Sequence, residues 1–469
     1  MGLLYHLICI ERRGGGAYDE GKLHMFNLGH RHFRSILKAI HVRRRFSRFL
    51  RILGPGLVTG AADDDPSGIA TYSQAGATAG YGLLWAIPAM FPLLVAVQES
   101  CARIGAVTGK GLAAVIKEHY SRKVLVILVV IVTIANTINI GADLGAMASA
   151  LQLLVPVPYL VAAMGFTVVV LLLEIFVSYR QYAKILKWLA LLLFSYPITA
   201  FVVGQPWGEV LKQTFAPQLV FSPQTVLMIV ALLGTTISPY LFFWDTSEVA
   251  EEEISKHRLG IRGLHPPKIT HHFLKSVRTD TFAGMSLAAI TAWFIMLTCA
   301  TVLFSHGITE INTAADAAKA IEPLVSQFPN AGMIAKIIFS VGIIGLGLLA
   351  VPVLAGSSSY AISESLGWRE GLYRKFSRAI GFYGVIILAT FVGFLMNFLG
   401  IDPIKALIFS AVINGVAAVP LLVMIAKVGA SEKIMGEYRS GLLSRTFVWI
   451  AFGVMLFAAV MMGLSFVVR

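Results

Sequence analysis

Residues 54–85 read GPGLVTGAADDDPSGIATYSQAGATAGYGLLW, which is typical of a membrane-spanning helix that stops halfway and starts again. Apolar residues run from Ile52 to Ala62, three aspartates and Pro66 follow, and helical sequence resumes at Ile69. The break comes roughly thirteen residues into the span, or about 20 Å along a helix, close to the middle of an apolar core of about 30 Å. Carboxylates at that depth are costly and usually serve a function.

The residues at the break favour a cation site. Pro66 has no amide hydrogen and disfavours helical geometry at Asp65, and Gly68 loosens the backbone. Backbone carbonyl groups near Ala62 therefore lose their helical partners, and together with the Asp65 carboxylate they offer the oxygen ligands that a hard cation prefers. The alternative interpretation is that the aspartates cap a helix that begins at Pro66, with residues 54–62 as a separate short segment.

The composition indicates an all-α integral membrane protein. Of the 469 residues, 57% are hydrophobic and 13% are charged, whereas about a quarter of a soluble protein is charged. The net charge of +13 would suit a nucleic-acid partner, but the basic residues lie in alternate loops, so we expect the lipid bilayer and no nucleic acid. The three cysteines have no metal-binding spacing, and we expect no cofactor and no enzymatic activity.

Apolar length predicts eleven membrane spans. Their approximate bounds are 52–80, 83–105, 124–152, 158–178, 183–204, 224–249, 281–305, 333–361, 379–400, 403–427 and 445–468. Lys and Arg are concentrated in residues 1–51 and in alternate loops, which predicts a cytoplasmic N-terminus in the plasma (inner) membrane. We expect a monomer.

The sixth span is interrupted like the first. Residues 225–253 read TVLMIVALLGTTISPYLFFWDTSEVAEEE, with the interruption at Thr235–Tyr240. Five spans separate the starts of the two broken helices, so they run in opposite directions, as in an inverted repeat. We therefore predict a basic tail (1–51), a first five-helix repeat (52–204), a second five-helix repeat (224–427) and an eleventh helix (445–469). The first half of each broken helix ends at the midplane, where its free carbonyl groups favour a cation.

Other polar residues in the spans have two interpretations. Asn136, Asn139 and Asp143 share one helical face, and they either line a path or bridge helices by hydrogen bonds. Asn414 is a weaker site candidate.

The remaining charged residues near span ends are expected to be solvated or paired. We expect the pairs Glu99–Arg103 and Glu174–Arg180 at the inner ends of spans two and four. We also expect Asp245 and Glu248 to lie on a solvated helix end rather than in an acidic vestibule, and Glu251–Glu253 and His271–His272 on solvated faces.

Several motifs resemble the NRAMP divalent-metal transporters. They are GPGLVTGAADDDP, AGYGLLW and CARIGAVTGKGLA in the first two spans, GADLGAMASAL in the third and GTTISPY in the sixth, with weaker similarity over most of the chain. The resemblance implies a LeuT-type fold of two inverted five-helix repeats with broken helices 1 and 6, plus an eleventh helix.

The chain departs from the family pattern at the metal site. The family's Asp-Pro-Gly-Asn is Asp65-Pro66-Ser67-Gly68 here, and its Met-Pro-His is Ser238-Pro239-Tyr240. The resemblance then leaves the Asp65 carboxylate, the carbonyl groups of Ala62 and Thr235, and the Ser238 hydroxyl as metal contacts, with Gly68 at the position of the missing asparagine. Without the soft methionine sulfur the site is hard, as in the NRAMP-related magnesium transporter branch.

The groups that the family links to proton movement are also altered. The family's Asp-Leu-Ala-Glu in span three is Asp143-Leu144-Gly145-Ala146, and Tyr240 replaces the histidine. We therefore predict a carrier of divalent cations, Mg²⁺ first and Mn²⁺ also, that works by alternating access without obligatory proton coupling. The alternatives are a proton-coupled Mn²⁺/Fe²⁺ symporter and, more distantly, a sodium-coupled amino-acid transporter or a membrane-embedded metallohydrolase.

Overall fold

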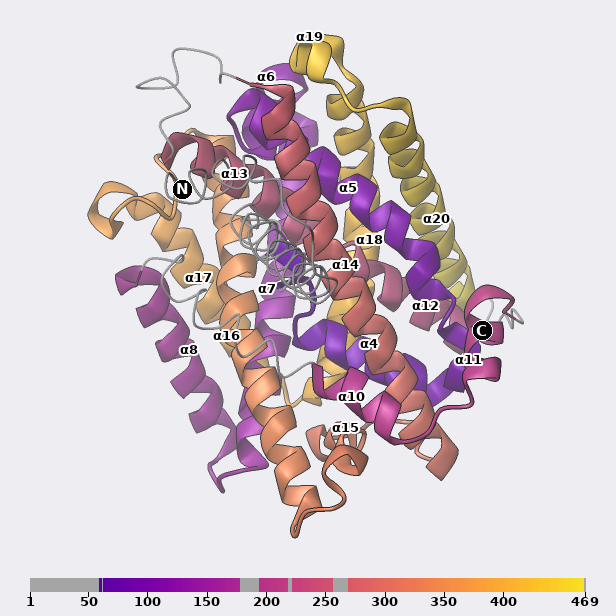
Figure 1. The fold of residues 1–469 in the computed structure, drawn as a ribbon. Coiled ribbons are helices and arrows are strands. Elements are labelled where there is room, and N and C mark those ends of the chain that lie inside the picture. Colours follow the sequence, from indigo (N-terminus) through magenta and orange to yellow (C-terminus); the bar gives the residue numbers. More distant parts are fainter. Residues whose placement is uncertain (1–58, 61, 178–193, 218–221, 256–268, 468–469) are drawn as a thin grey trace, which may run out of the picture. The chain divides into compact units, whose positions relative to one another are not determined.

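The structure is a computed structural model, and it describes residues 59–60, 62–177, 194–217, 222–255 and 269–467. All regular elements in these ranges are helices, numbered as in Figure 1. Up to residue 255 the α-helices are α4 (Pro66–Ala79), α5 (Ala86–Thr108), α6 (Leu112–His119), α7 (Arg122–Gln152), α8 (Tyr159–Phe176), α10 (Ser195–Val202), α11 (Trp207–Phe215), α12 (Pro223–Thr236) and α13 (Pro239–Ser255).

The second half of the chain contains the longest helices. They are α14 (His271–Val302), α15 (Ala314–Lys319), α16 (Ala331–Leu366), α17 (Ile380–Met396), α18 (Pro403–Ala430), α19 (Glu432–Met435) and α20 (Leu442–Val467). The 3-10 turns are η2 (Gly80–Leu83), η4 (Phe304–His306), η5 (Glu322–Val325), η6 (Phe376–Arg378), η7 (Asn397–Leu399) and η8 (Gly436–Tyr438).

Capping residues set where the helices begin. Proline occupies the first turn of α4, α12 and α18, and the residues before it, Asp65, Ser222 and Asp402, accept hydrogen bonds from the exposed amides of that turn. Proline is well suited to a first turn because its missing amide hydrogen would have no helical partner there. A capping oxygen typically contributes about 1 kcal/mol.

Nine helices of the described part are long and apolar enough to span a membrane. They correspond to nine of the eleven predicted spans, while the first and fifth fall partly on residues 52–58, 61 and 183–193, which lie outside the described residues. The helix of the seventh span starts earlier than the apolar stretch by which the span was predicted. α14 begins at His271, ten residues before the predicted 281, because its first turns are polar and apolar length detects only the later part.

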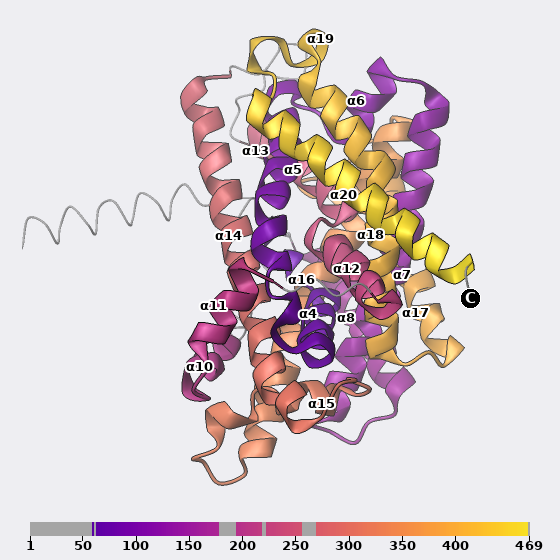
Figure 2. The same cartoon turned by 90° about the vertical axis from the view of Figure 1, so that its right-hand side faces the viewer.

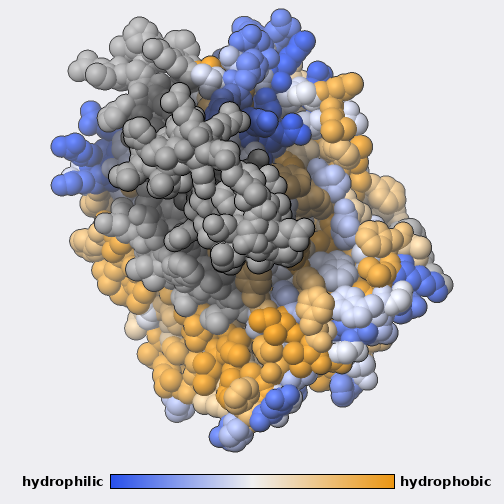
Figure 3. Space-filling model, viewed as in Figure 1, coloured by the Kyte–Doolittle hydropathy of each residue, from blue (hydrophilic) through white to orange (hydrophobic). Residues whose placement is uncertain are grey.

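The surface of these helices suits a lipid environment. Large hydrophobic side chains are exposed along α7, α8, α17 and α20. Figure 3 shows hydrophobic residues over the lower left of one face and hydrophilic residues at its upper and lower edges. α20 packs against α18, α5 and α12 at the outside of this group (Figure 2). The described chain is therefore a multi-pass membrane protein.

Three carboxylates that were predicted to be solvated, Asp245, Glu248 and Glu251, are buried. Asp245 on α13 is buried and lies 3.4 Å from the Thr59 hydroxyl. Glu251 is also buried and accepts hydrogen bonds from the Tyr360 hydroxyl and the Leu372 amide. α16 and the segment that follows it cover this part of α13, which sequence patterns do not reveal. His271 and His272 are exposed, as predicted.

Small residues let α12 and α18 approach closely. A Cβ atom built on Gly234 of α12 would overlap the Ala411 carbonyl oxygen and the Gly415 amide nitrogen of α18. Close backbone approach through glycine is a common way in which membrane helices gain van der Waals contact.

We predict that Gly234→Ala destabilises the protein by about 2 kcal/mol, because α12 and α18 must separate to admit the methyl group. The measurement is thermal unfolding in detergent. Gly165→Ala in α8 is the matched control, since a Cβ there meets nothing within 4 Å, and the better helix propensity of alanine leaves it neutral or slightly stabilising. Equal melting temperatures for the two variants would contradict the prediction.

Candidate functional site

Both predicted breaks are present. Thr59–Gly60 and Ala62–Asp63 are helical, Asp65 is extended (φ −65°, ψ 171°), and α4 restarts at Pro66. α12 ends at Thr236 and α13 starts at Pro239. At the first break the two interpretations of the sequence both apply, because helical backbone precedes the aspartates and Asp65 also caps the helix that follows.

The two broken helices run antiparallel past one another. Thr59 contacts Asp245, and the Tyr240 hydroxyl donates to the Ala62 carbonyl at 2.8 Å. Further along, a Cβ on Gly68 would lie 3.3 Å from the Thr235 hydroxyl. Residue numbers rise in one helix as they fall in the other, which is the arrangement that an inverted repeat requires. The two breaks therefore form one junction.

Asp65 is held from three directions. Its Oδ1 accepts hydrogen bonds from the Ser67 hydroxyl (2.6 Å) and the Gly68 amide (2.7 Å) of its own chain turn. Its Oδ2 accepts from the Asn139 amide of α7 at 3.0 Å. The oxygen of the same Asn139 side chain accepts from the Ser410 hydroxyl of α18 at 2.7 Å. The carboxylate is thus positioned by both α4 and α7, and α18 fixes the residue that positions it.

Each of the two carbonyl groups predicted as ligands accepts a hydrogen bond from a side-chain hydroxyl. The Ala62 carbonyl accepts from Tyr240, and the Thr235 carbonyl accepts from Ser238 at 2.7 Å. Ser238 also lies 3.1 Å from the Gly234 carbonyl. The structure therefore brings four of the predicted residues, namely Ala62, Asp65, Gly68 and Thr235, to the junction, and it places Ser238 over the end of α12.

The junction contains further acidic side chains besides Asp65. Asp63, Asp64 and Asp143 are at most 3% exposed, and Asp63 Oδ1, Asp64 Oδ1 and both Asp143 oxygens accept no hydrogen bond from a described group. None of these residues forms an ion pair within the described ranges. Buried carboxylates without a counter-charge are costly, so this arrangement favours either a proton or a cation at the junction.

Protein side chains alone do not build a closed metal cage. Among the described residues, no group of three or more His, Cys, Asp or Glu side chains is arranged to hold a metal ion. A cation bound to Asp65 would need backbone carbonyls, hydroxyls or water to complete its shell, which suits an ion that is held transiently.

The other predicted polar residues have separate roles. Asn136 bonds to the Leu354 carbonyl (3.2 Å) and the Ser358 hydroxyl (3.0 Å) of α16, so it bridges helices. Arg103 pairs with Glu99 as expected. Glu174 is buried, and its expected partner Arg180 lies outside the described residues. Asn414 is buried, and its amide has no partner in the described part of the chain.

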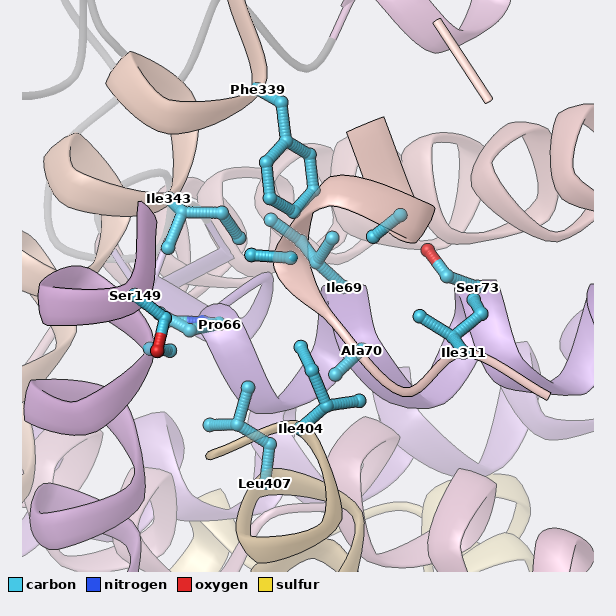
Figure 4. Close-up of a pocket in the computed structure, with 13 residues that line it drawn as sticks. Pro66, Ile69, Ala70, Ser73, Ser149, Ile311, Phe339, Ile343, Ile404 and Leu407 are labelled. Carbon is cyan, nitrogen blue, oxygen red and sulfur yellow. The ribbon is translucent and has the colours of Figure 1, made fainter. Parts of the chain in front are cut away.

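An apolar cavity lies beside the start of α4. Figure 4 shows Pro66 and Ile69 facing it together with Ile343, Ile404 and Leu407 from α16 and α18. Ala146, at the position of the family's acidic residue, also lines the cavity. Its volume is about 10 Å³, which is space for about one water molecule. The first half of α4 is therefore tightly packed on this side, where α7, α15, α16 and α18 also line the cavity.

Sequence reasoning missed several residues of the junction. Ser410 and Tyr72 have no sequence signal that points to the junction, yet Ser410 bonds to Asn139 and the Tyr72 hydroxyl lies 3.2 Å from that of Thr236. Asn139 was noted only as part of a polar face. Its spacing from Asp143 indicates a shared helical face. Only the packing of α7 against α4 and α18 shows that Asn139 contacts Asp65.

Comparison with known proteins identifies related sequences. The model of the family Nramp, described as Natural resistance-associated macrophage protein-like, matches residues 56–465. The divalent metal cation transporter MntH of Caldanaerobacter subterraneus subsp. tengcongensis is 26% identical over 441 residues, which cover 90% of this chain and 96% of that protein. MntH of Klebsiella pneumoniae subsp. pneumoniae is 26% identical over 395 residues, or 83% and 87% of the two chains.

Solved structures share the fold. The Eremococcus coleocola manganese transporter superposes with a TM-score of 0.70 at 16% identity, covering 89% of this chain and 86% of that one. The crystal structure of MhsT in complex with L-phenylalanine gives a TM-score of 0.62 at 13% identity, covering 88% of this chain and 98% of that one. The expected LeuT-type arrangement is thereby confirmed.

We predict that Asn139→Ala weakens divalent-metal binding about tenfold, because it removes a hydrogen bond to a charged group at the junction. Ser410 keeps its bond to the Leu407 carbonyl, so the change is confined to Asp65. Isothermal titration with Mn²⁺ measures the effect. Asn136→Ala is the matched control, one turn away on the same helix face and without contact to Asp65. Equal losses in both variants would mean that α7 packing, and not Asp65, is affected.

Proposed function

The chain belongs to the Nramp family, and on that premise we propose that it carries divalent metal cations across a membrane by alternating access. The two halves of the fold move around the junction of the broken helices and open it to one side at a time. Asp65 is the charged ligand, and the carbonyl groups of Ala62 and Thr235 join it once the hydroxyls of Tyr240 and Ser238 release them and turn toward the ion. The membrane is the plasma membrane, with the N-terminus in the cytoplasm, and the unit is a monomer.

We propose that Mg²⁺ is the preferred ion and that Mn²⁺ is also accepted. The observation that supports this is the donor set at the junction, since the carboxylate of Asp65, two carbonyls and the hydroxyls of Thr235, Ser238 and Tyr240 are all oxygen donors. Oxygen donors suit hard cations, whereas soft sulfur ligands favour transition metals. Mg²⁺ usually keeps several waters and needs few protein ligands, in keeping with the absence of a closed cage among the described side chains.

We propose further that transport is not obligatorily coupled to protons. Tyr240 stands where the family has histidine, and its hydroxyl is engaged with the Ala62 carbonyl. Ala146 lines an apolar cavity where the family has an acidic residue. An inside-negative potential drives a divalent ion inward by about 4.6 kcal/mol per 100 mV, so uptake needs no second ion. Asp63, Asp64 and Asp143 are the groups through which a proton-coupled carrier of Mn²⁺ or Fe²⁺ would have to work.

The test is flux into proteoliposomes that contain a metal-sensitive dye or a pH dye, at a clamped membrane potential. We expect Mg²⁺ and Mn²⁺ influx without internal acidification, and its loss in Asp65→Asn. Asparagine is as good a helix cap as aspartate, so this variant keeps the bonds to Ser67 and Gly68 while it removes the charge.

Three outcomes would contradict the proposal in different ways. Normal metal influx in folded Asp65→Asn protein would exclude the junction as the transport site. Acidification that rises with metal concentration and disappears in Asp65→Asn would identify a proton-coupled symporter. Wild-type influx of Mn²⁺ without influx of Mg²⁺ would reject only the proposed preference for Mg²⁺ and would leave the proposed transport site standing.

We predict that Ser238→Cys raises affinity for Cd²⁺ relative to Mg²⁺ by about tenfold, or about 1.4 kcal/mol, because one soft donor of nearly the same size enters the junction. Competition of each ion against Mn²⁺ uptake gives the ratio. The matched control is Ser359→Cys, a buried serine that bonds to the Phe382 carbonyl of α17 instead. An unchanged ratio in Ser238→Cys would place the origin of selectivity outside the second break.

A further inference from the structure

A basic cleft lies at the end of the helices opposite to the apolar cavity. It has a volume of about 530 Å³, within the usual range for ligand sites, and is bounded by α14, the last turns of α5 and the turn η8. Figures 1 and 2 both show the first turns of α14, the end of α5 and the neighbouring α19 at the same end of the described helices. The distribution of Lys and Arg assigns this end to the cytoplasm.

Four basic side chains line the cleft. His271, Lys275 and Arg278 follow one another at helical spacing on α14, and Arg103 comes from α5. Arg103 is compensated by Glu99, but Lys275 and Arg278 are exposed and form no ion pair with a described residue. Glu437 is the acidic residue in the lining, so the cleft keeps a net positive charge.

The cleft lies at the depth of lipid headgroups. α14 has 32 residues and is therefore about 48 Å long, which exceeds an apolar core of about 30 Å. Phe282, also in the lining, is 51% exposed and packs edge-to-face on Phe91 of α5, with ring centroids 5.7 Å apart. It follows Lys275 by two turns. The cleft thus has a basic mouth and an apolar aromatic floor that faces the bilayer.

We propose that this cleft binds an anionic phospholipid of the cytoplasmic leaflet. Lys275 and Arg278 contact the phosphate, Arg103 and Tyr438 line the inner wall, and Phe282 packs against the upper acyl chain. The start of α14, where Thr270 caps the helix, adds the partial positive charge of a helix N-terminus. Basic pockets between membrane helices at this level are suited to anionic headgroups.

The combination of charge and apolar surface favours a lipid over a soluble anion. A free phosphate would use Lys275 and Arg278 but would leave Phe282 and the buried Leu274 without a function in the cleft. A lipid uses both at once. Its binding would tie η8, and with it the α18–α20 connection, to α5 and α14.

The experiment counts bound lipids by native mass spectrometry on purified full-length protein titrated with dioleoylphosphatidylglycerol or dioleoylphosphatidylcholine. We expect the wild type to prefer phosphatidylglycerol, and Lys275→Gln/Arg278→Gln to bind it about tenfold more weakly. Both side chains are exposed, so the variant is expected to fold, and its melting temperature checks this. Lys275→Arg/Arg278→Lys keeps the charges and should keep the binding.

The matched control is Arg122→Gln/Lys123→Gln at the start of α7, which removes two exposed charges at the same end of the protein but outside the cleft. It should bind phosphatidylglycerol as the wild type does. Equal binding of the two lipids by the wild type, or equal losses in the two glutamine variants, would overturn the proposal. Displacement of phosphatidylglycerol by 10 mM sodium phosphate would overturn it as well, by assigning the cleft to a soluble anion.

Discussion

The cost of placing carboxylates in the interior of a membrane protein governs the centre of this molecule. Three consecutive aspartates are buried at a helix break, with Asp143 as a fourth carboxyl group, and they form no ion pair with a described residue. A continuous helix would leave these groups unsupported in a medium of low dielectric constant. The break provides amide and hydroxyl donors for Asp65, and it frees carbonyl groups from helical hydrogen bonds, so that in the proposed mechanism a cation finds more than one ligand there.

The junction depends equally on both halves of the chain. α4 and its preceding turn supply the acid, whereas the break before α13 and α13 itself supply Ser238 and Tyr240, whose hydroxyls cover the carbonyl groups. α7 and α18 then fix Asp65 through the bonds of Asn139. Because these elements come from both repeats, a relative movement of the halves necessarily changes the geometry around Asp65. This is the physical link between ion binding and a change of access in the proposed mechanism.

The sequence was sufficient for the features that depend on local chemistry. Pro66 and Pro239 predict the two breaks because proline removes a helical hydrogen bond. Apolar length locates nine spans that the structure describes. Features that depend on packing were not accessible. The polar first turns of α14 carry no apolar signal, and the burial of Asp245 and Glu251 follows from the coverage of α13 by distant segments. Asn139 and Ser410 are 271 positions apart, so their contact has no local signature.

The hydroxyl groups that bond to the Ala62 and Thr235 carbonyls have a consequence for the part of a transport cycle in which no ion is bound. A carrier that transports no second ion in the opposite direction must change its access with the binding site empty. Carbonyl groups and a carboxylate without hydrogen-bond partners would make that step slow. Tyr240 and Ser238 act as internal substitutes for the ion at the two carbonyl groups, while Asn139, Ser67 and Gly68 hold the Asp65 carboxylate in position. In the proposed transport cycle the resting junction is thereby prepared to return unloaded, and the turnover of the protein then depends as much on these neutral side chains as on its acids.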